Sequence, residues 1–189
     1  AVVKEILNFN EALAVAYEFY QAHPDETLIV VTADHDTGGL INGFPATGYS
    51  GWYENISYQR ISKDSFADLC MAIMKSRRIF TWEDMKDLLS EKLGFWSKIA
   101  IPDADEKMLQ EKFDITFNQR NSMDEKTLYK DFNEFTVSVF KVMDNATGID
   151  WTTTGHSGNP VPVFAVGVGA EEFSRISNNI EIPDRIRSI

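Results

Sequence analysis

Leu28-Ile29-Val30-Val31-Thr32-Ala33-Asp34-His35-Asp36-Thr37-Gly38-Gly39 is the stretch that decides the fold. Its four leading apolar residues are typical of a strand buried on both faces, as in a parallel sheet. An amphipathic helix is predicted ahead of it over residues 2–20, with a break expected near Asn8 and Asn10. The helix should end at His23-Pro24-Asp25. Helix, short turn and apolar strand together indicate half of an α/β unit.

The residues that follow this strand are suited to a metal ion. Carboxylate and imidazole groups, here Asp34 and His35, are ligands that zinc accepts. Successive strand residues face opposite sides, so both reach one ion only if the strand ends there. Gly38 and Gly39 permit the sharp turn that this requires. A structural role for the pair, with Asp34 capping the loop and His35 bonded to backbone, is the alternative.

A second imidazole lies in Gly155-His156-Ser157-Gly158, just ahead of another apolar strand predicted over residues 161–168. A histidine flanked by glycine can approach a metal ion closely, although it can equally be structural. Ser157 does not form a nucleophile elbow, because Pro160 excludes the helix that must follow one. His156 is therefore a second candidate metal ligand.

The part between these motifs has a different pattern. Residues 1–40 and 151–189 are predicted to form an α/β core, and residues 41–150 a mainly helical insertion. Thr81-Trp82-Glu83-Asp84 resembles a capping box, and Gly148 is suited to end a helix. The predicted helices cover residues 64–77, 81–93, 103–113, 122–147 and 171–176, and a polar tail follows the last.

Composition excludes several classes of function. The chain has 189 residues, 43% of them hydrophobic and 25% charged, which is typical of a globular protein. The formal net charge is −11, and no cluster of Lys and Arg suggests nucleic-acid binding. No apolar run is long enough for a membrane span, and Ala1 does not begin a signal peptide. Cys70 is the only cysteine and is expected to be a buried apolar residue.

The two motifs, in this order, resemble the alkaline phosphatase family. The matching segments are residues 27–39 and 155–167, with the helix over residues 2–20 ahead of them and residues 178–182 as a closing segment. The resemblance implies an α/β fold: the C-terminal part of an alkaline-phosphatase-like three-layer α/β/α sandwich with a largely helical insertion.

The resemblance also implies an activity and a ligand set. It implies hydrolysis of phosphate monoesters through a phosphorylated Ser or Thr, with two zinc ions and a magnesium ion. Asp34 and His35 are expected on the zinc ion that activates the nucleophile, and His156 on the zinc ion that activates water. No magnesium ligand is assigned here. The family further implies a periplasmic or secreted enzyme and a possible homodimer.

Part of the family's site is not recognised in this sequence. The nucleophile and the remaining ligands are expected upstream of Ala1, so we expect a fragment that is inactive by itself and binds metal weakly or not at all. The alternatives are another member of the superfamily (a phosphodiesterase, sulfatase or phosphomutase) or a non-catalytic binding module on the same scaffold.

Overall fold

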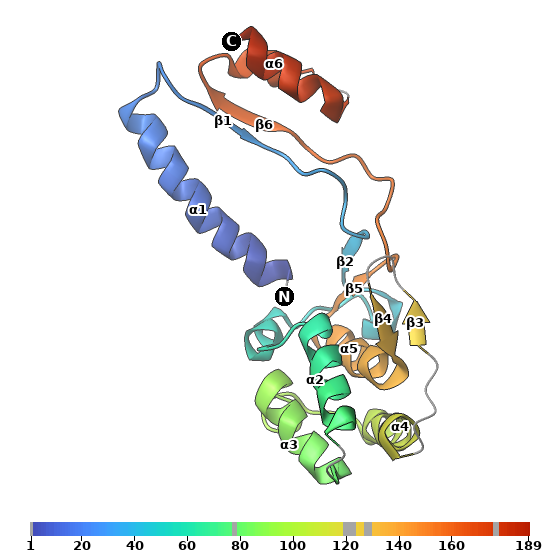
Figure 1. Cartoon of the computed structure of the whole chain (residues 1–189). Coiled ribbons are helices and arrows are strands. Elements are labelled where there is room, and N and C mark those ends of the chain that lie inside the picture. Colours follow the sequence, from blue (N-terminus) through green and yellow to red (C-terminus); the bar gives the residue numbers. More distant parts are fainter. Residues whose placement is uncertain (1, 77–78, 119–123, 127–129, 176–177) are drawn as a thin grey trace. The chain divides into compact units, whose positions relative to one another are not determined.

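The computed structural model describes residues 2–76, 79–118, 124–126, 130–175 and 178–189 (Figure 1). The described residues form two compact units. One unit is Leu40–Gly155, and the other joins Val2–Gly39 to His156–Ile189. None of the described helices combines the length and the hydropathy that crossing a membrane would require.

The unit that joins both ends of the sequence contains a two-stranded sheet. β1 (Leu28–Val31) pairs with β6 (Phe164–Gly167) in the antiparallel direction, which places Leu28 opposite Gly167 and Val31 opposite Phe164. The expected parallel sheet is therefore wrong for this strand pair. The apolar run predicted a strand correctly, but such a run carries no information on the direction of its partner. The α/β class of the chain is confirmed, because helices and strands are mixed along it.

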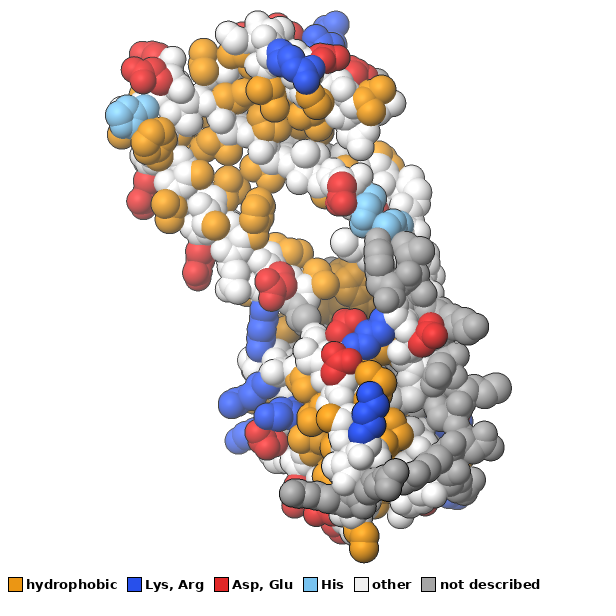
Figure 2. Space-filling view, viewed as in Figure 1, with side chains coloured by type: hydrophobic (Ala, Val, Ile, Leu, Met, Phe, Trp, Pro, Cys, Tyr) orange, Lys and Arg blue, Asp and Glu red, His pale blue; other side chains and the backbone are white. Residues whose placement is uncertain are grey.

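Helix α1 (Val2–Ala22) precedes β1 and is continuous (Figure 1). The break expected near Asn8 and Asn10 is wrong, since both side chains are exposed and neither disturbs the helix. The helix ends before His23, as predicted. No side chain of α1 is buried, and Figure 2 shows hydrophobic side chains on the open surface of this unit. The large exposed hydrophobic residues of α1 are Ile6, Leu7, Phe9, Val15, Tyr17 and Phe19.

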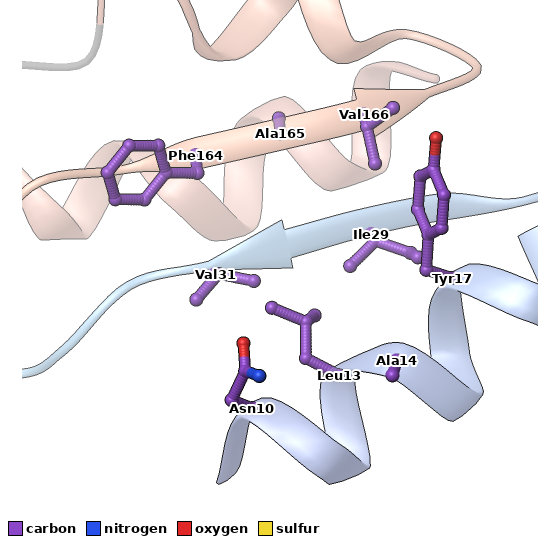
Figure 3. A pocket seen from close by; sticks show the side chains of 9 residues that line it. All are labelled: Asn10, Leu13, Ala14, Tyr17, Ile29, Val31, Phe164, Ala165 and Val166. Atoms are coloured by element: carbon purple, nitrogen blue, oxygen red, sulfur yellow. The ribbon is translucent and has the colours of Figure 1, made fainter. Parts of the chain in front are cut away.

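An apolar groove of about 340 Å³ lies between α1 and the sheet (Figure 3). Side chains of α1 form one wall and side chains of both strands the other, as the close-up shows. Its lining residues are Asn10, Leu13, Ala14, Tyr17, Ile29, Val31, Phe164, Ala165 and Val166. The groove leaves β1 only half-buried, where the sequence predicts a fully covered strand.

The end of this unit also differs from prediction. β6 is shorter than the predicted strand, and the residues from Pro160 to Val163 precede it unpaired, as the prolines indicated. A 3-10 helix, η4 (Ala170–Phe173), replaces the predicted α-helix, whose last residue Ile176 lies outside the described residues. The expected polar tail contains η5 (Asn179–Glu181) and α6 (Ile182–Ser188).

The other unit is mainly helical. Its two small sheets are antiparallel: β2 (Leu40–Asn42) with β5 (Ile149–Trp151), and β3 (Asp124–Lys126) with β4 (Asp131–Asn133). Its α-helices are α2 (Lys63–Lys75), α3 (Trp82–Leu93), α4 (Asp103–Phe113) and α5 (Glu134–Thr147). Shorter helical segments are η1 (Pro45–Thr47), η2 (Tyr53–Tyr58) and the π-helix η3 (Asp114–Asn118).

Local capping explains where several of these helices begin and end. Thr81 caps α3 through a complete capping box, in which Asp84 N donates to Thr81 Oγ1 at 3.2 Å and Thr81 N donates to Asp84 Oδ2 at 2.8 Å. Gly148 ends α5 in the left-handed conformation, as predicted. The predicted start of this helix is wrong. Asn133 is the N-cap of α5, whereas Ser122 lies outside the described residues.

The helical unit has a well-packed hydrophobic core. Phe66, Phe113 and Phe135 are fully or almost fully buried, and the ring of Phe135 contacts the rings of the other two. Cys70 lies in this core with no exposed surface, which confirms the prediction of a buried residue. Burial raises the pKa of its thiol to about 12. The remaining core residues are Met85, Leu89, Leu93, Phe95, Ile99, Leu109, Val139, Phe140, Val142 and Met143.

Candidate metal centre

The antiparallel pairing of β1 and β6 brings the two sequence motifs together. The first motif follows β1 and the second precedes β6. In a parallel pair these two positions would lie at opposite ends of the sheet, whereas in an antiparallel pair they lie at the same end. Beyond the last ladder pair the chains stay adjacent, since Thr32 Oγ1 donates to the carbonyl oxygen of Pro162 at 3.1 Å. The strand direction therefore forms the site.

The imidazole rings of His35 and His156 stack at this end of the sheet. Their ring centroids are 3.4 Å apart and their planes differ by 22°, and they appear as adjoining pale-blue side chains in Figure 2. A metal ion bound to an imidazole lies in the plane of that ring. Because the two planes are stacked, one ion cannot lie in both. The arrangement brings both predicted histidine ligands together and is suited to two neighbouring ions.

The tautomer of His35 follows from its backbone contact. Its Nδ1 lies 3.0 Å from the carbonyl oxygen of Asp36, which can only accept a hydrogen bond. Nδ1 therefore carries a proton, so in the neutral ring the lone pair lies on Nε2. A backbone carbonyl that fixes the second ring nitrogen is the usual support of a metal-binding histidine.

Asp34 presents a carboxylate oxygen beside this lone pair. Its Oδ2 lies 3.4 Å from Nε2 of His35, while its Oδ1 accepts a hydrogen bond from the His35 backbone N–H at 3.0 Å. The Asp34 side chain is 84% exposed, so this oxygen can approach an ion without losing a buried partner. At zinc–ligand distances of roughly 2.0–2.2 Å, two ligands of a tetrahedral ion are about 3.3–3.5 Å apart. The spacing of these two atoms matches that value.

Asp36 and Ser157 connect the two motifs directly. Oδ2 of Asp36 accepts a hydrogen bond from Ser157 Oγ at 2.5 Å, and others from the backbone N–H groups of Gly39 at 2.8 Å and Gly38 at 3.2 Å. The Ser157 hydroxyl and the Gly39 N–H hold the pKa of Asp36 below its usual value. Asp36 is not among the site residues predicted from the sequence. Its position two and three residues before a Gly-Gly pair was the available signal.

The donor types at this site fit zinc, but their number does not complete a zinc site. Zinc is normally bound by three or four protein ligands, and Asp34, His35 and His156 supply one oxygen and two ring nitrogens. Within the described ranges, no three His, Cys, Asp or Glu side chains are grouped so that they could hold one ion. The third histidine, His23, lies at the end of α1 and contacts Phe19.

Known proteins match the whole chain. A sequence model of the alkaline phosphatase family covers residues 1–189. Alkaline phosphatase 3 of Bacillus subtilis (strain 168) is 27% identical over 97% of this chain and 34% of its own length. Repressible alkaline phosphatase of Saccharomyces cerevisiae (strain ATCC 204508 / S288c) is 25% identical over 95% of this chain and 30% of its own length.

A solved structure gives the same assignment. The cold-active alkaline phosphatase from a psychrophilic Shewanella species superposes with a TM-score of 0.67 and 26% identity, over 97% of this chain and 39% of that protein. The chain spans about a third of the length of the curated relatives that it matches. These matches favour the phosphatase over the phosphodiesterase, sulfatase and phosphomutase alternatives. The chain belongs to the alkaline phosphatase family.

Proposed function

We propose that this chain contributes part of the active site of a phosphomonoesterase that uses two zinc ions and a magnesium ion. Asp34 and His35 would bind the zinc ion beside the Ser or Thr nucleophile, and His156 the zinc ion beside the hydrolytic water. We assign no magnesium ligand to these residues. In this proposal Val2–Gly39 and His156–Ile189 belong to the catalytic core, and the helical unit is an insertion.

The spacing of Asp34 Oδ2 and His35 Nε2 is the observation that carries the proposal. The two atoms are 3.4 Å apart, and the second keeps its lone pair because Nδ1 donates to a backbone carbonyl. A purely structural pair would also bond His35 to the backbone, so the 3.4 Å spacing of the two atoms is the feature that favours a shared ion. The stacked rings support the assignment of His156 to a different ion, since no single ion lies in both ring planes.

Two neighbouring zinc ions would supply a lowered pKa for the attacking hydroxyl or water and charge stabilisation for the leaving oxygen. The residues of this chain would hold their donor atoms in place for that chemistry. Asp34 supplies a negative charge, which partly offsets the charge of the ion, and the neutral imidazole of His35 supplies a directed lone pair. The Asp36 carbonyl oxygen keeps that lone pair on Nε2 by holding the proton on Nδ1.

The proximity of the two histidines favours the enzyme over a non-catalytic binding module. A module would have no need for two facing imidazoles beside a carboxylate. One feature supports the module as a second candidate: Tyr49, Trp52 and Tyr53 of the helical unit expose 76%, 42% and 53% of their surface. An interaction surface on the insertion is compatible with catalysis elsewhere in the chain.

Titration of the 189-residue chain with zinc tests the ligand assignment. In the NMR spectrum of ¹⁵N-labelled histidine, we expect zinc to shift the ring signals of His35 and His156 and to leave His23 unchanged. Asp34→Ala should abolish the zinc-induced shift of the His35 ring signals, and His35→Ala should abolish zinc binding at the site that the two residues share. His23→Ala is the matched control. Equal shifts for all three histidines, or none at millimolar zinc, would overturn the assignment.

A second measurement tests the activity. With only three ligands shared between two ions, the 189-residue chain should hydrolyse p-nitrophenyl phosphate no faster than buffer that contains zinc. A polypeptide that also carries the nucleophile and the missing ligands should turn over, and His156→Ala in that polypeptide should remove most of the activity. If the 189-residue chain hydrolyses this substrate and His156→Ala abolishes the activity, the conclusion that its metal site is incomplete is wrong.

A further inference from the structure

The pairing of Asp36 with Ser157 has a consequence for the two histidines beside them. Asp36 follows His35 directly, and Ser157 follows His156 directly. One carboxylate oxygen, Oδ2 of Asp36, accepts the Ser157 hydroxyl across 121 residues of sequence. The same oxygen accepts hydrogen bonds from the backbone N–H groups of Gly38 and Gly39, in the loop of the first motif.

We infer that Asp36 and Ser157 are a positioning pair, which holds His35 and His156 side by side so that each faces its own metal ion. That each histidine faces a metal ion rests on the proposed function, whereas the positioning of the two rings by this pair does not. Neither residue is proposed as a ligand. Oδ2 of Asp36 is occupied by three donors, and Ser157 Oγ also accepts a hydrogen bond from the backbone N–H of Asn159 at 3.3 Å.

Three contacts show why this pair is suited to that task. The β1–β6 ladder ends at the pair Val31 and Phe164, and just beyond it Thr32 Oγ1 donates to the carbonyl oxygen of Pro162. The histidines lie beyond this point on loops that also contain glycine. Glycine loses the most conformational freedom on ordering, so a loop of this kind needs side-chain bonds to keep one conformation. The bond between Asp36 and Ser157 supplies such a link between the two loops.

The bond is also stronger than an ordinary hydroxyl contact. An ionised carboxylate that accepts from a hydroxyl forms a charge-assisted hydrogen bond, typically 2.5–2.7 Å long and about twice as strong as a neutral one. The backbone N–H groups of Gly38 and Gly39 fix the direction of the carboxylate before it meets Ser157. Removal of residues that orient a metal ligand through hydrogen bonds typically lowers metal affinity by about 10–100-fold.

The first test needs no metal. In the 189-residue chain the rings of His35 and His156 should give a strong nuclear Overhauser effect, because their centroids are 3.4 Å apart. Asp36→Ala or Ser157→Ala should weaken this effect several-fold. The double variant should weaken it no further than either single variant does. Ser157→Thr, which keeps the hydroxyl, should restore it. Thr37→Ala, an exposed hydroxyl in the same loop, is the matched control and should change nothing.

The second test uses zinc. Ser157→Ala should raise the zinc concentration that half-saturates the His35 shift by about 10–100-fold, and Ser157→Thr should recover most of that loss. Amide hydrogen exchange of β1 and β6, in the unit that contains both residues, shows whether that unit stays folded in the variants. If both alanine variants keep the ring-to-ring effect, the inference is overturned. If zinc shifts the signals of neither histidine in the unsubstituted chain, the proposed function fails. The Overhauser effect between the two rings still shows whether Asp36 and Ser157 position them.

Discussion

The ring of His35 lies 3.4 Å from the ring of His156, centroid to centroid, although the two residues are more than a hundred positions apart in sequence. The antiparallel register of β1 and β6 produces this contact, because it places the end of one strand beside the start of the other. Each imidazole alone has a structural explanation. Their stacking beside the carboxylate of Asp34 is what supports the common role that we propose for them.

The register depends on Gly167, at the end of β6. This residue has φ +107°, and a Cβ atom there would lie 2.0 Å from the carbonyl oxygen of Thr27. Gly167→Ala should destabilise the strand pair by roughly 2–4 kcal/mol through backbone strain and overpacking. Amide hydrogen exchange of β1 and β6 measures this directly. Gly158→Ala is the control: a Cβ at that position has no atom within 4 Å, and protection should stay within about 0.5 kcal/mol.

Asp144 makes the stability of the helical unit depend on pH. Burial, and then the charge of Asp150, raise its pKa from 3.8 to about 7, while Lys141 and Lys63 oppose the shift. The folded state therefore holds a proton that the unfolded state has already released, so stability falls as pH rises from about 4 to about 7. This pKa difference corresponds to roughly 4 kcal/mol.

The variant Asp144→Asn tests this dependence, because it keeps the shape of the side chain without the charge. Urea unfolding between pH 4 and pH 8 should show a smaller loss of stability for the variant, and above pH 7 the variant should be the more stable protein. Asp87→Asn, at an exposed position on α3, should behave like the unsubstituted chain. Equal pH profiles for Asp144→Asn and Asp87→Asn would contradict the prediction.

Cys70 should be unreactive in the folded chain. It has no exposed surface, and a pKa of about 12 leaves almost no thiolate at neutral pH. Reaction with Ellman's reagent at pH 8 should therefore be at least 100-fold slower than in 6 M guanidinium chloride, where one thiol per chain should react at once. Rapid labelling under native conditions would show that the core around Cys70 opens readily. Cys70→Ser should react in neither condition and serves as the blank.

Helix α1 should be less protected than α5. None of its side chains is buried, whereas α5 buries seven, including Phe135, Val139 and Met143. Most of the stability of a protein helix comes from packing of its apolar face, so α1 lacks the main source of stability. Amide hydrogen exchange should be at least tenfold faster in α1 than in α5. Similar protection of both helices would mean that α1 is covered in solution by something the described contacts do not include.

The elements predicted correctly from sequence are those whose signals are local. The capping box of α3 was recognised because Thr81 and Asp84 are three residues apart, and the end of α5 because Gly148 favours the left-handed conformation. The start of α5 was missed for the opposite reason. Its N-cap Asn133 follows a short strand, β4, whose pairing with β3 is a contact between segments that no capping pattern reveals.

The features of the candidate site also divide into those with a local sequence signal and those that depend on contacts between distant segments. Asp34, His35 and His156 are predicted as donor residues from the sequence alone, since residue type and neighbouring glycines are read along the chain. Three features appear only in the folded chain: β1 and β6 are antiparallel, the two imidazole rings stack, and Asp36 is hydrogen-bonded to Ser157. The physical reason is that an apolar strand has the same pattern in either direction. Only the contacts between distant segments select which of their ends come together.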